Sequence, residues 1–326
     1  MENRERVAKA LLQAEGFLSG QQLSEELNIT RAAVNKHIQS LREEGWEITS
    51  VPNRGYRLEA RPRGLSAPVI LAELHTSEIG QNLRILDEVD STNRAAKEWA
   101  RQGAPHGSAV LAKRQSAGRG RRGRSWASSE GGLYCSIVLR PHLATEKVPR
   151  LTLCAALAVR EAIERTTGLQ PGIKWPNDLL LGGKKLCGIL TELSADAERL
   201  EFAVLGIGIN VAHTDFPPEV QPLATSLADE GAAVERSELA AALFDALEPL
   251  LLQMELGGFS EIMEQYESRS LTLGKRVRIL GVDGTEEGVA EAFDDLGMIL
   301  LRKDDGSLLR IASGDVSLRP VEGAQP

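Results

Sequence analysis

The spacing of apolar and turn residues changes twice along this chain, which predicts three folding units. Over residues 1–62 apolar residues recur at helical spacing, and over residues 68–268 strand-like and helix-like runs alternate. Over residues 270–322 short β runs are broken by glycine and aspartate. A length of 326 residues is sufficient for two or three domains that each bury a core. We therefore expect an α+β protein divided at these boundaries.

The N-terminal unit has the pattern of a winged helix-turn-helix domain. We expect its first helix over residues 5–14. The second and third helices begin after the N-cap residues Ser19 and Thr30, and Gln22 completes a capping-box pattern with Ser19. In the third helix, apolar residues at positions i, i+4 and i+7 form the stripe that we expect to be buried: Val34, Ile38 and Leu41.

The other faces of the third helix predict contact with DNA. They carry side chains suited to base edges in the major groove: Arg31, Ala32, Asn35, Lys36 and Gln39. Strands over residues 46–51 and 56–58 form a hairpin wing with Arg54 at its tip. The alternative is a helical module that binds another protein through a solvated polar face. The wing and its arginines favour DNA.

The middle unit predicts a mixed sheet with helices, and the last unit predicts a small β-barrel. After a polar hinge at residues 61–68, we expect strands over residues 84–89, 107–112, 133–140, 173–175, 186–193 and 202–210. Helices are expected over residues 91–103, 151–166 and 237–255, the last with a kink at Pro249. Five short strands form the barrel: 276–280, 288–293, 298–302, 308–311 and 316–318.

The composition excludes several classes of protein. A net charge of −8 argues against non-specific nucleic-acid binding over the whole surface. Cys135, Cys154 and Cys187 have no CxxC spacing, which indicates buried thiols in a reducing compartment. No signal-peptide pattern opens the chain, and the longest apolar run, residues 151–159, is too short to span a bilayer. We expect a cytoplasmic protein with no membrane partner and no metal site of its own.

Two short blocks carry the strongest functional information. Residues 118–124 read GRGRRGR, which places four arginines and three glycines in one loop of an acidic protein. Arginine grips phosphate or carboxylate with a fork of donors, and glycine lets the backbone close around such a ligand. The loop is not a Walker phosphate loop, because no GKS or GKT ends it. Taken alone, the loop fits a solvated basic loop or a nucleic-acid patch as well as it fits a site that binds an anionic ligand. The second block is KWPND, residues 174–178.

The order of these blocks among others resembles the biotin–protein ligases, of the two-function type that also represses biotin-synthesis genes. The match covers nearly the whole chain. Its blocks are Ser91-Thr92-Asn93 after Glu88-Val89-Asp90, Gln115 ahead of GRGRRGR, Trp126, KWPND, Lys185-Leu186-Cys187-Gly188-Ile189-Leu190 and Gly206-Ile207-Gly208-Ile209-Asn210. The resemblance also implies that the C-terminal barrel is SH3-like and that the N-terminal domain binds operator DNA.

The resemblance implies a reaction in two steps that uses biotin, ATP and Mg²⁺. The biotin carboxylate attacks the α-phosphorus of ATP, which releases pyrophosphate and leaves biotinyl-5′-AMP. A lysine of a biotin carboxyl carrier domain then attacks this mixed anhydride. Both steps build negative charge on phosphate, so the protein must supply fixed positive charge. The adenylate would also act as the corepressor that favours a homodimer on operator DNA.

The resemblance assigns roles to individual residues. Lys185 would be the catalytic cation, acting with Arg121 and Asp178; its alternatives are an exposed turn lysine or its neighbour Lys184. The biotin contacts would be Ser91, Thr92, Asn93, Gln115, Arg119, Gly120, Arg121, Trp126, Lys185, Gly188 and Gly208. The ATP and adenylate contacts would be Arg121, Arg122, Arg124, Asn177, Asn210 and Arg319. The match around Arg319 is weaker, because a tryptophan-containing stretch found in some members is missing.

Some of these residues also have purely structural interpretations. Ser91 fits a helix cap, Trp126 fits a core ring, and Asn177 with Asp178 fits a polar turn. We expect the arginine loop to be mobile without ligand, because its like charges repel. Two rival functions remain open, a lipoate-type ligase and a regulator that binds the adenylate without transferring it. The arginine loop and the winged helix argue against the first, and Lys185 with KWPND argues against the second.

Overall fold

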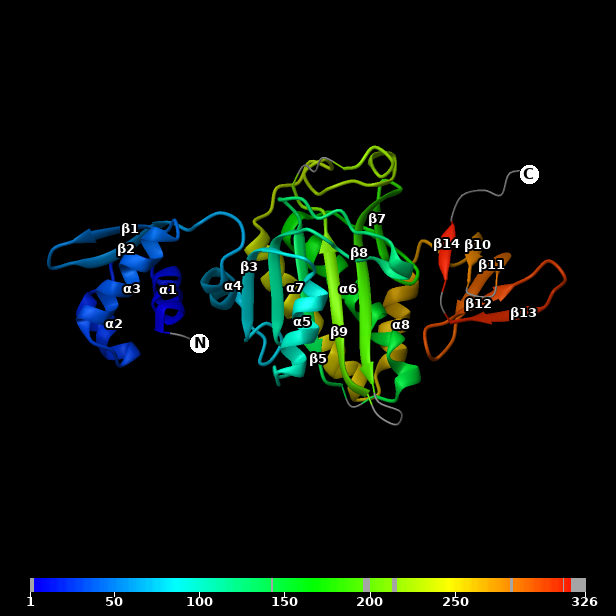
Figure 1. Ribbon diagram of the computed structural model, residues 1–326, viewed down its shortest axis with the longest axis horizontal. Coiled ribbons are helices and arrows are strands. Elements are labelled where there is room, and N and C mark those ends of the chain that lie inside the picture. Colours follow the sequence, from blue (N-terminus) through cyan, green and yellow to red (C-terminus); the bar gives the residue numbers. More distant parts are fainter. Residues whose placement is uncertain are drawn as a thin grey trace.

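The computed structural model describes residues 3–141, 143–195, 200–212, 216–281, 284–312 and 314–317. The described parts lie in a row along the long axis (Figure 1). A helical N-terminal unit with a β-hairpin is followed by a broad sheet with helices and then by a small sheet. The α+β architecture predicted from the sequence is confirmed. Arg319 lies outside the described residues.

The N-terminal unit has the predicted helices and wing. Its elements are α1 Asn3–Gln13, α2 Gly20–Leu27, α3 Arg31–Glu43, β1 Glu47–Val51 and β2 Gly55–Ala60. The predicted caps are confirmed, since Ser19 Oγ accepts the Gln22 N–H at 3.0 Å and Thr30 Oγ1 accepts the Ala33 N–H at 3.1 Å. The predicted apolar stripe of α3 is fully buried in the core of this unit.

Helix α4 (Ala67–Glu73) was not predicted, and it begins at the end of the segment expected to be a polar hinge. Pro68 lies in its first turn, where proline is tolerated. Val69 of α4 belongs to the core of the N-terminal unit, whereas Ile70 and Leu71 belong to the core of the central unit. Because α4 is buried in both cores, it connects the two units through packed side chains.

The central unit is built on a mixed sheet, as predicted, but the described residues form seven strands of it where six were expected. Only β3 and β4 pair in parallel; the other neighbours are antiparallel. The order across the sheet is β3-β4-β5-β9-β8-β7-β6. The strands are β3 Leu83–Val89, β4 Ala109–Gln115, β5 Leu133–Leu139, β6 Gly172–Lys174, β7 Asp178–Leu181, β8 Lys184–Ala195 and β9 Leu200–Ile209. Strand β7 was not predicted, because the turn at Pro176 lies directly before it.

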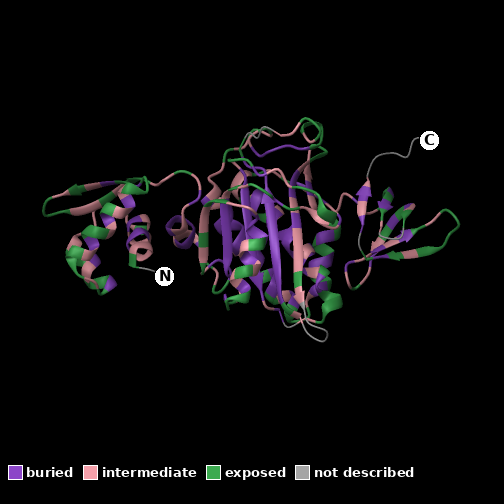
Figure 2. Ribbon diagram, in the orientation of Figure 1, coloured by how far each residue is buried: buried purple, intermediate pink, exposed green. Residues whose placement is uncertain are grey.

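Helices cover both faces of this sheet, and Figure 2 shows its central strands buried along most of their length. The helices are α5 Thr92–Arg101, α6 Pro149–Thr167, α7 Arg236–Glu255 and α8 Phe259–Ser268. Helices α6, α7 and α8 share the main core on one face, and α5 packs in a separate core on the other. Helix α8 was not predicted, and α7 continues through Pro249. Within the described ranges, no helix has the length and apolarity needed to cross a membrane.

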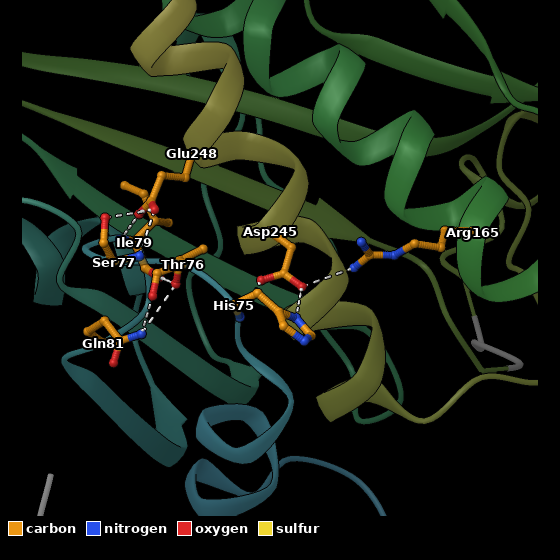
Figure 3. A network of polar contacts seen from close by, with 8 residues as sticks. All are labelled: His75, Thr76, Ser77, Ile79, Gln81, Arg165, Asp245 and Glu248. Atoms are coloured by element: carbon orange, nitrogen blue, oxygen red, sulfur yellow. Dashed lines mark hydrogen bonds and ion pairs between the residues drawn. The ribbon is translucent and has the colours of Figure 1, made fainter.

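The segment that leads into β3 is clamped onto α7 by Glu248 (Figure 3). Its carboxylate accepts the backbone N–H groups of Ser77, Glu78 and Ile79 at 2.6–2.8 Å. Partial burial opposes ionisation of Glu248, but these hydrogen bonds outweigh it and hold the pKa of the carboxyl below its usual value. One turn earlier on α7, Asp245 accepts a hydrogen bond from the backbone N–H of His75. The start of β3 is thereby fixed against the helix layer.

The C-terminal unit is an antiparallel sheet of five strands in the order β13-β12-β11-β10-β14, as predicted in strand number. The strands are β10 Arg276–Leu280, β11 Thr285–Phe293, β12 Ile299–Arg302, β13 Leu308–Ile311 and β14 Asp315–Ser317. The indole N–H of Trp175 donates to the carbonyl of Gly297 at 2.9 Å, which ties this sheet to the central unit. The edge strand β14 of this sheet lies beside the arginine loop, since Arg124 pairs with Asp315 at 2.6 Å.

Candidate active site

A cavity of about 110 Å³ lies where the ends of several central elements meet. Most of the residues predicted for the site line it: Ser91, Thr92, Asn93, Gln115, Arg119, Gly120, Arg121, Arg124, Trp126, Asn177, Asp178, Lys185, Gly188 and Gly208. They come from segments up to about a hundred residues apart, at the start of α5, the end of β4, the arginine loop, β7, β8 and β9. The fold therefore gathers the sequence blocks on one concave surface.

The floor of the cavity is made of glycines covered by an indole. A Cβ atom on Gly188 would lie 2.8 Å from the ring of Trp126, and one on Gly208 would lie 2.6 Å from its Nε1. Gly206 on β9 was not predicted as a site residue. A Cβ there would lie 2.1 Å from Asn93 Oδ1. At these three positions only glycine leaves room for the neighbouring side chain. The Trp126 ring packs against Gly188 and Gly208, and the Asn93 amide packs against Gly206.

The start of α5 is held by a chain of hydrogen bonds under the cavity. Gln115 Oε1 accepts from both the backbone N–H and the hydroxyl of Thr92, at 2.8 and 3.1 Å. Its amide nitrogen donates to Ser128 Oγ at 2.8 Å. Ser91 occupies the N-cap position, but its side chain makes no capping bond. Gln115 therefore orients Thr92. The Ser91 hydroxyl does not cap the helix, although Ser91 occupies the N-cap position.

Asn93 is fixed by two groups that the sequence did not single out. The hydroxyl of the fully buried Ser136 lies 2.6 Å from Asn93 Oδ1 and 2.8 Å from Thr92 Oγ1. Asn93 Nδ2 donates to Glu192 at 2.8 Å. Ser136 and Glu192 lie within apolar strands; an acidic residue among the apolar residues of β8 was the signal available for Glu192.

Glu192 also pairs with two cations. Lys97 Nζ of α5 lies 2.7 Å from its carboxylate, and Arg119 of the arginine loop lies 3.6 Å from it. Burial opposes ionisation of Glu192, but the hydrogen bonds from Lys97 and Asn93 outweigh it and lower the pKa of the carboxyl. The carboxylate therefore stays ionised at neutral pH and keeps Arg119 beside the cavity.

Lys185 is one of the residues that line the cavity. Its Nζ lies 2.7 Å from Asp178 and 5.3 Å from the centroid of the Trp126 ring. Asp178 has a second cation 4.0 Å away, Lys174, whose pKa is lowered by burial although Asp178 opposes this. The Lys185 side chain is 35% exposed, so it can reach a ligand without a large rearrangement.

The arginine loop closes on itself. The Gly120 N–H donates to the Arg124 carbonyl at 2.7 Å, and the Trp126 N–H donates to the Gly118 carbonyl at 2.9 Å. Arg122 adopts a left-handed backbone conformation with φ of 54°. The repulsion that we expected among the arginines is offset, because carboxylates of other elements lie beside them. The mobility of the arginine loop without ligand stays a prediction.

Arg121 joins the loop to two other elements. Its guanidinium donates to Asn177 Oδ1 at 3.0 Å and to the carbonyl of Gly314 at 3.3 Å. Burial lowers the pKa of Arg121, and the nearby charges of Asp315 and Asp178 oppose that shift. Asp315 of β14, another lining residue that was not predicted, pairs with Arg124 at 2.6 Å. The C-terminal sheet therefore supplies part of the cavity wall.

The structure does not bring two of the predicted contacts into the lining. Asn210 is buried, and its amide nitrogen donates to the carbonyl of Thr225 at 2.9 Å. Arg122 lies 3.7 Å from Asp315 but does not line the cavity. Arg319, the third ATP contact outside this set, is not among the described residues. The roles of these three residues in nucleotide binding stay predictions.

The predicted DNA-reading residues of α3 are all exposed on one side of the N-terminal unit: Arg31, Ala32, Asn35, Lys36 and Gln39. Arg54 at the wing is also exposed, and its guanidinium stacks 4.4 Å from the ring of Phe17. Arg57 stacks on the same ring at 4.9 Å. Phe17, which was not among the predicted residues, therefore orients two wing arginines by cation–π contact.

Comparison with known protein families matches all three units. Residues 86–210 match the biotin/lipoate A/B protein ligase family. Residues 3–57 match a helix-turn-helix domain family, and residues 272–319 match the biotin protein ligase C-terminal domain. The central match includes every residue that lines the cavity except Asp315, which lies in the C-terminal match.

Individual proteins resemble the chain over almost its full length. The chain is 42% identical over 306 residues to the bifunctional ligase/repressor BirA of Bacillus spizizenii, covering 93% of this chain and 94% of the relative. It is 34% identical over 315 residues to the protein of the same name from Escherichia coli, covering 96% of each. The biotin protein ligase of Aquifex aeolicus, solved with biotin and ATP, superposes with a TM-score of 0.66 at 37% identity. That alignment covers 73% of this chain and 99% of the other.

Proposed function

The chain belongs to the family of bifunctional biotin–protein ligases and repressors, and on that premise we propose how its own residues perform the reaction. It is a ligase that joins biotin to a carrier protein at the expense of ATP, and a repressor that carries a helix-turn-helix domain. We propose that the acceptor is a lysine of a biotin carboxyl carrier domain. The observation that supports the proposed activation of biotin by ATP is the convergence of Lys185, the arginine loop and the start of α5 on one cavity.

In the first step, a biotin carboxylate oxygen attacks the α-phosphorus of ATP and pyrophosphate leaves. Two anions must approach each other, so the barrier falls when fixed cations lie beside both. Lys185 is the cation proposed to neutralise the carboxylate and the α-phosphate. Arg121 and Arg124, which line the same cavity, are proposed to hold the phosphates.

The head of biotin is a cyclic urea, which needs both donors and acceptors. We propose that it lies against Thr92 and Asn93, whose side chains are held in place by Gln115, Ser136 and Glu192. The glycine floor and Trp126 would cover its apolar parts. In the second step the carrier amine attacks the anhydride carbon and AMP leaves.

Two lining residues have finer roles in this proposal. Asp178 is proposed to orient Lys185 and, once Lys185 turns to the phosphate, to accept a hydrogen bond from the carrier amine. Asn177 is proposed to orient Arg121. Among the described residues, no three acidic, cysteine or histidine side chains are placed to hold a metal ion together. Mg²⁺ is proposed to arrive with the triphosphate, its main ligand, and to neutralise phosphate charge there.

As a repressor, the protein is proposed to place α3 in the major groove of operator DNA, with Arg54 near the backbone. Two half-sites require two such helices, so we propose that the adenylate favours a homodimer. The carrier domain and the second subunit would then compete for one edge of the central sheet. Sedimentation of the adenylate-bound protein tests this; a monomer at concentrations that protect operator DNA would contradict it. The three buried, unpaired cysteines suit a reducing compartment such as the cytoplasm.

The ligase is tested by incubating the protein with biotin, Mg-ATP and a carrier domain and recording the intact mass of the carrier. We expect a gain of one biotin, lost with Lys185→Ala and retained with Lys184→Ala, the exposed neighbour that serves as a matched control. Equal turnover of both variants would remove Lys185 from the mechanism. Replacing biotin by lipoate tests the rival substrate. Adenylate bound without transfer would instead indicate a regulator that only senses biotin.

A further inference from the structure

A chain of polar contacts runs from a partly buried ion pair to the wall of the cavity. Lys97 Nζ lies 2.7 Å from the carboxylate of Glu192, which accepts a hydrogen bond from Asn93 Nδ2 at 2.8 Å. Asn93 Oδ1 lies 2.6 Å from the hydroxyl of the fully buried Ser136, and that hydroxyl lies 2.8 Å from Thr92 Oγ1. Thr92 lines the cavity. The ion pair is therefore connected through Asn93 and Ser136 to a residue that can meet the ligand.

The groups around Asn93 Nδ2 fix the direction of the Asn93 amide. The Glu192 carboxylate, which stays ionised beside Lys97, only accepts hydrogen bonds. The backbone carbonyl of Leu190, 3.3 Å from the same nitrogen, is also only an acceptor. Both groups need a donor, so the NH₂ group of Asn93 must face them. The amide oxygen of Asn93 then faces Ser136.

The single proton of the Ser136 hydroxyl goes to the Asn93 oxygen. Over the described residues, this oxygen has no other hydrogen-bond donor, and Asn93 is only 4% exposed to water. A buried polar atom without a partner destabilises the protein, whereas a hydroxyl turns freely to suit its neighbours, so Ser136 donates to Asn93. Ser136 Oγ can then only accept a proton from Thr92 Oγ1.

Thr92 therefore has a hydrogen-bond acceptor on each of its two protein neighbours. Its hydroxyl lies 2.8 Å from Ser136 Oγ and 3.1 Å from Gln115 Oε1. Gln115 Oε1 is an acceptor because it also bonds the backbone N–H of Thr92 at 2.8 Å. The one hydroxyl proton of Thr92 is used in one of these two bonds. Toward the cavity, the Thr92 hydroxyl therefore offers only a lone pair.

We propose that Ser136 and Glu192 are positioning residues that direct the Thr92 hydroxyl proton into the protein, so that Thr92 accepts a hydrogen bond from an N–H group of the ligand. Neither residue is among those that line the cavity. The ring of biotin is a cyclic urea, with an N–H group on each side of its carbonyl. The site selects a ring with an N–H group beside Thr92 and disfavours one with an oxygen atom there, because two lone pairs would face each other without a proton. This inference rests on the proposed placement of the biotin head against Thr92.

Calorimetric titration of the full chain with two analogues of biotin tests this selection. Each analogue is a cyclic carbamate in which an oxygen atom replaces one of the two ureido N–H groups. One isomer places its oxygen beside Thr92, and the other keeps an N–H group there. The quantity to compare is the Kd of each isomer divided by the Kd of biotin for the same protein. In the unmodified protein we expect this ratio to be about ten or more for one isomer, because a buried polar group is left without a partner.

Two variants test whether the chain of contacts sets this preference. Ser136→Ala removes a group that accepts the Thr92 proton. Glu192→Gln replaces an acceptor by an amide, which can donate to Asn93 Oδ1 and lets the Asn93 amide turn over. In both variants the Thr92 hydroxyl can turn its proton toward the ligand, so the ratio of the disfavoured isomer should fall by about threefold or more. The ratio of the other isomer should not change, since division by the Kd of biotin cancels a general loss of affinity.

Two matched controls carry the same chemical changes elsewhere in the chain. Ser108→Ala removes a hydroxyl that is equally buried, and Glu286→Gln removes the charge of a carboxylate that pairs with Lys303 at 2.8 Å in the C-terminal sheet. Both controls should keep the ratios of the unmodified protein. The proposal is overturned if the unmodified protein disfavours neither isomer, or if Ser136→Ala and Glu192→Gln keep its ratios. If biotin itself does not bind the unmodified protein, the proposed biotin site fails as well, so the two failures can be told apart.

Discussion

Substituting Gly206 by alanine should disturb biotin binding through Asn93 without touching a charged residue. The added methyl would lie 2.1 Å from Asn93 Oδ1, and real contacts of this kind stay beyond 3.0 Å. Asn93 would have to move by about 0.9 Å. Since Gly206 lies inside β9 between two paired strands, the backbone is less free to move than the amide side chain.

The size of the effect follows from what holds Asn93. Its amide contacts the fully buried Ser136 at 2.6 Å and the partly buried Glu192 at 2.8 Å, and Asn93 itself is only 4% exposed. Overpacking costs about 1–3 kcal/mol, and a buried polar group that loses its partner costs about 1–3 kcal/mol. We therefore expect Gly206→Ala to lower the free energy of unfolding by about 2–4 kcal/mol and to weaken biotin binding at least tenfold.

A double-mutant cycle gives the decisive assay. If the strain comes from Asn93, adding Asn93→Ala to Gly206→Ala should cost much less than the sum of the two single changes, in urea unfolding and in biotin titration. Gly16→Ala controls for the loss of glycine flexibility, because a Cβ on Gly16 meets nothing within 4 Å. Additive effects, or a Gly206→Ala protein as stable as the unmodified one, would refute this reasoning.

Three further predictions concern parts outside the cavity. Glu248→Gln should lower stability by about 1–2 kcal/mol at pH 7. Folding lowers the pKa of the Glu248 carboxyl, so its stabilising contribution is complete above the unfolded pKa and is lost as the pH falls through the folded pKa. The urea midpoints of the two proteins should therefore converge in acid. Val69→Ala should lower the free energy of unfolding by about 1–3 kcal/mol and separate the calorimetric transition of the N-terminal unit from that of the rest. A single unchanged transition would contradict the coupling through α4. The thiols of Cys135, Cys154 and Cys187, whose pKa values are raised by complete burial, should react with a thiol reagent only on unfolding; fast labelling of the folded protein would contradict this.

Local elements were predictable from the sequence where a local cause sets them. Ser19 and Thr30 cap their helices because the hydroxyl that accepts the N–H group lies three residues away in the chain. The stripe of α3 is buried because its spacing matches the helical period. Helix α4 was missed because its start carries Pro68 and its burial depends on two cores that the sequence does not display.

The candidate site was predictable to the extent that its residues form recognisable blocks. The loop of arginines, KWPND and Lys185 stand out by composition, and the fold brings most of them to one cavity. Asn210 belongs to such a block, yet its amide is used by a carbonyl of the neighbouring segment. Membership of a sequence block therefore predicts that a residue lies near the cavity. Its hydrogen-bond partners in the folded protein decide whether its side chain faces the cavity.

The sequence by itself determined the kinds of elements and the residue types gathered around the cavity, because these depend on periodicity and side-chain chemistry. The tertiary structure decided how those charges are balanced. Ser136, Glu192 and Asp315 lie far along the chain from the groups that they hold. The bond of Ser136 to Asn93 spans 43 residues, that of Glu192 to Asn93 spans 99, and that of Asp315 to Arg124 spans 191. Coulomb and hydrogen-bond energies depend on distance in space, which is set only when the central and C-terminal sheets pack against each other.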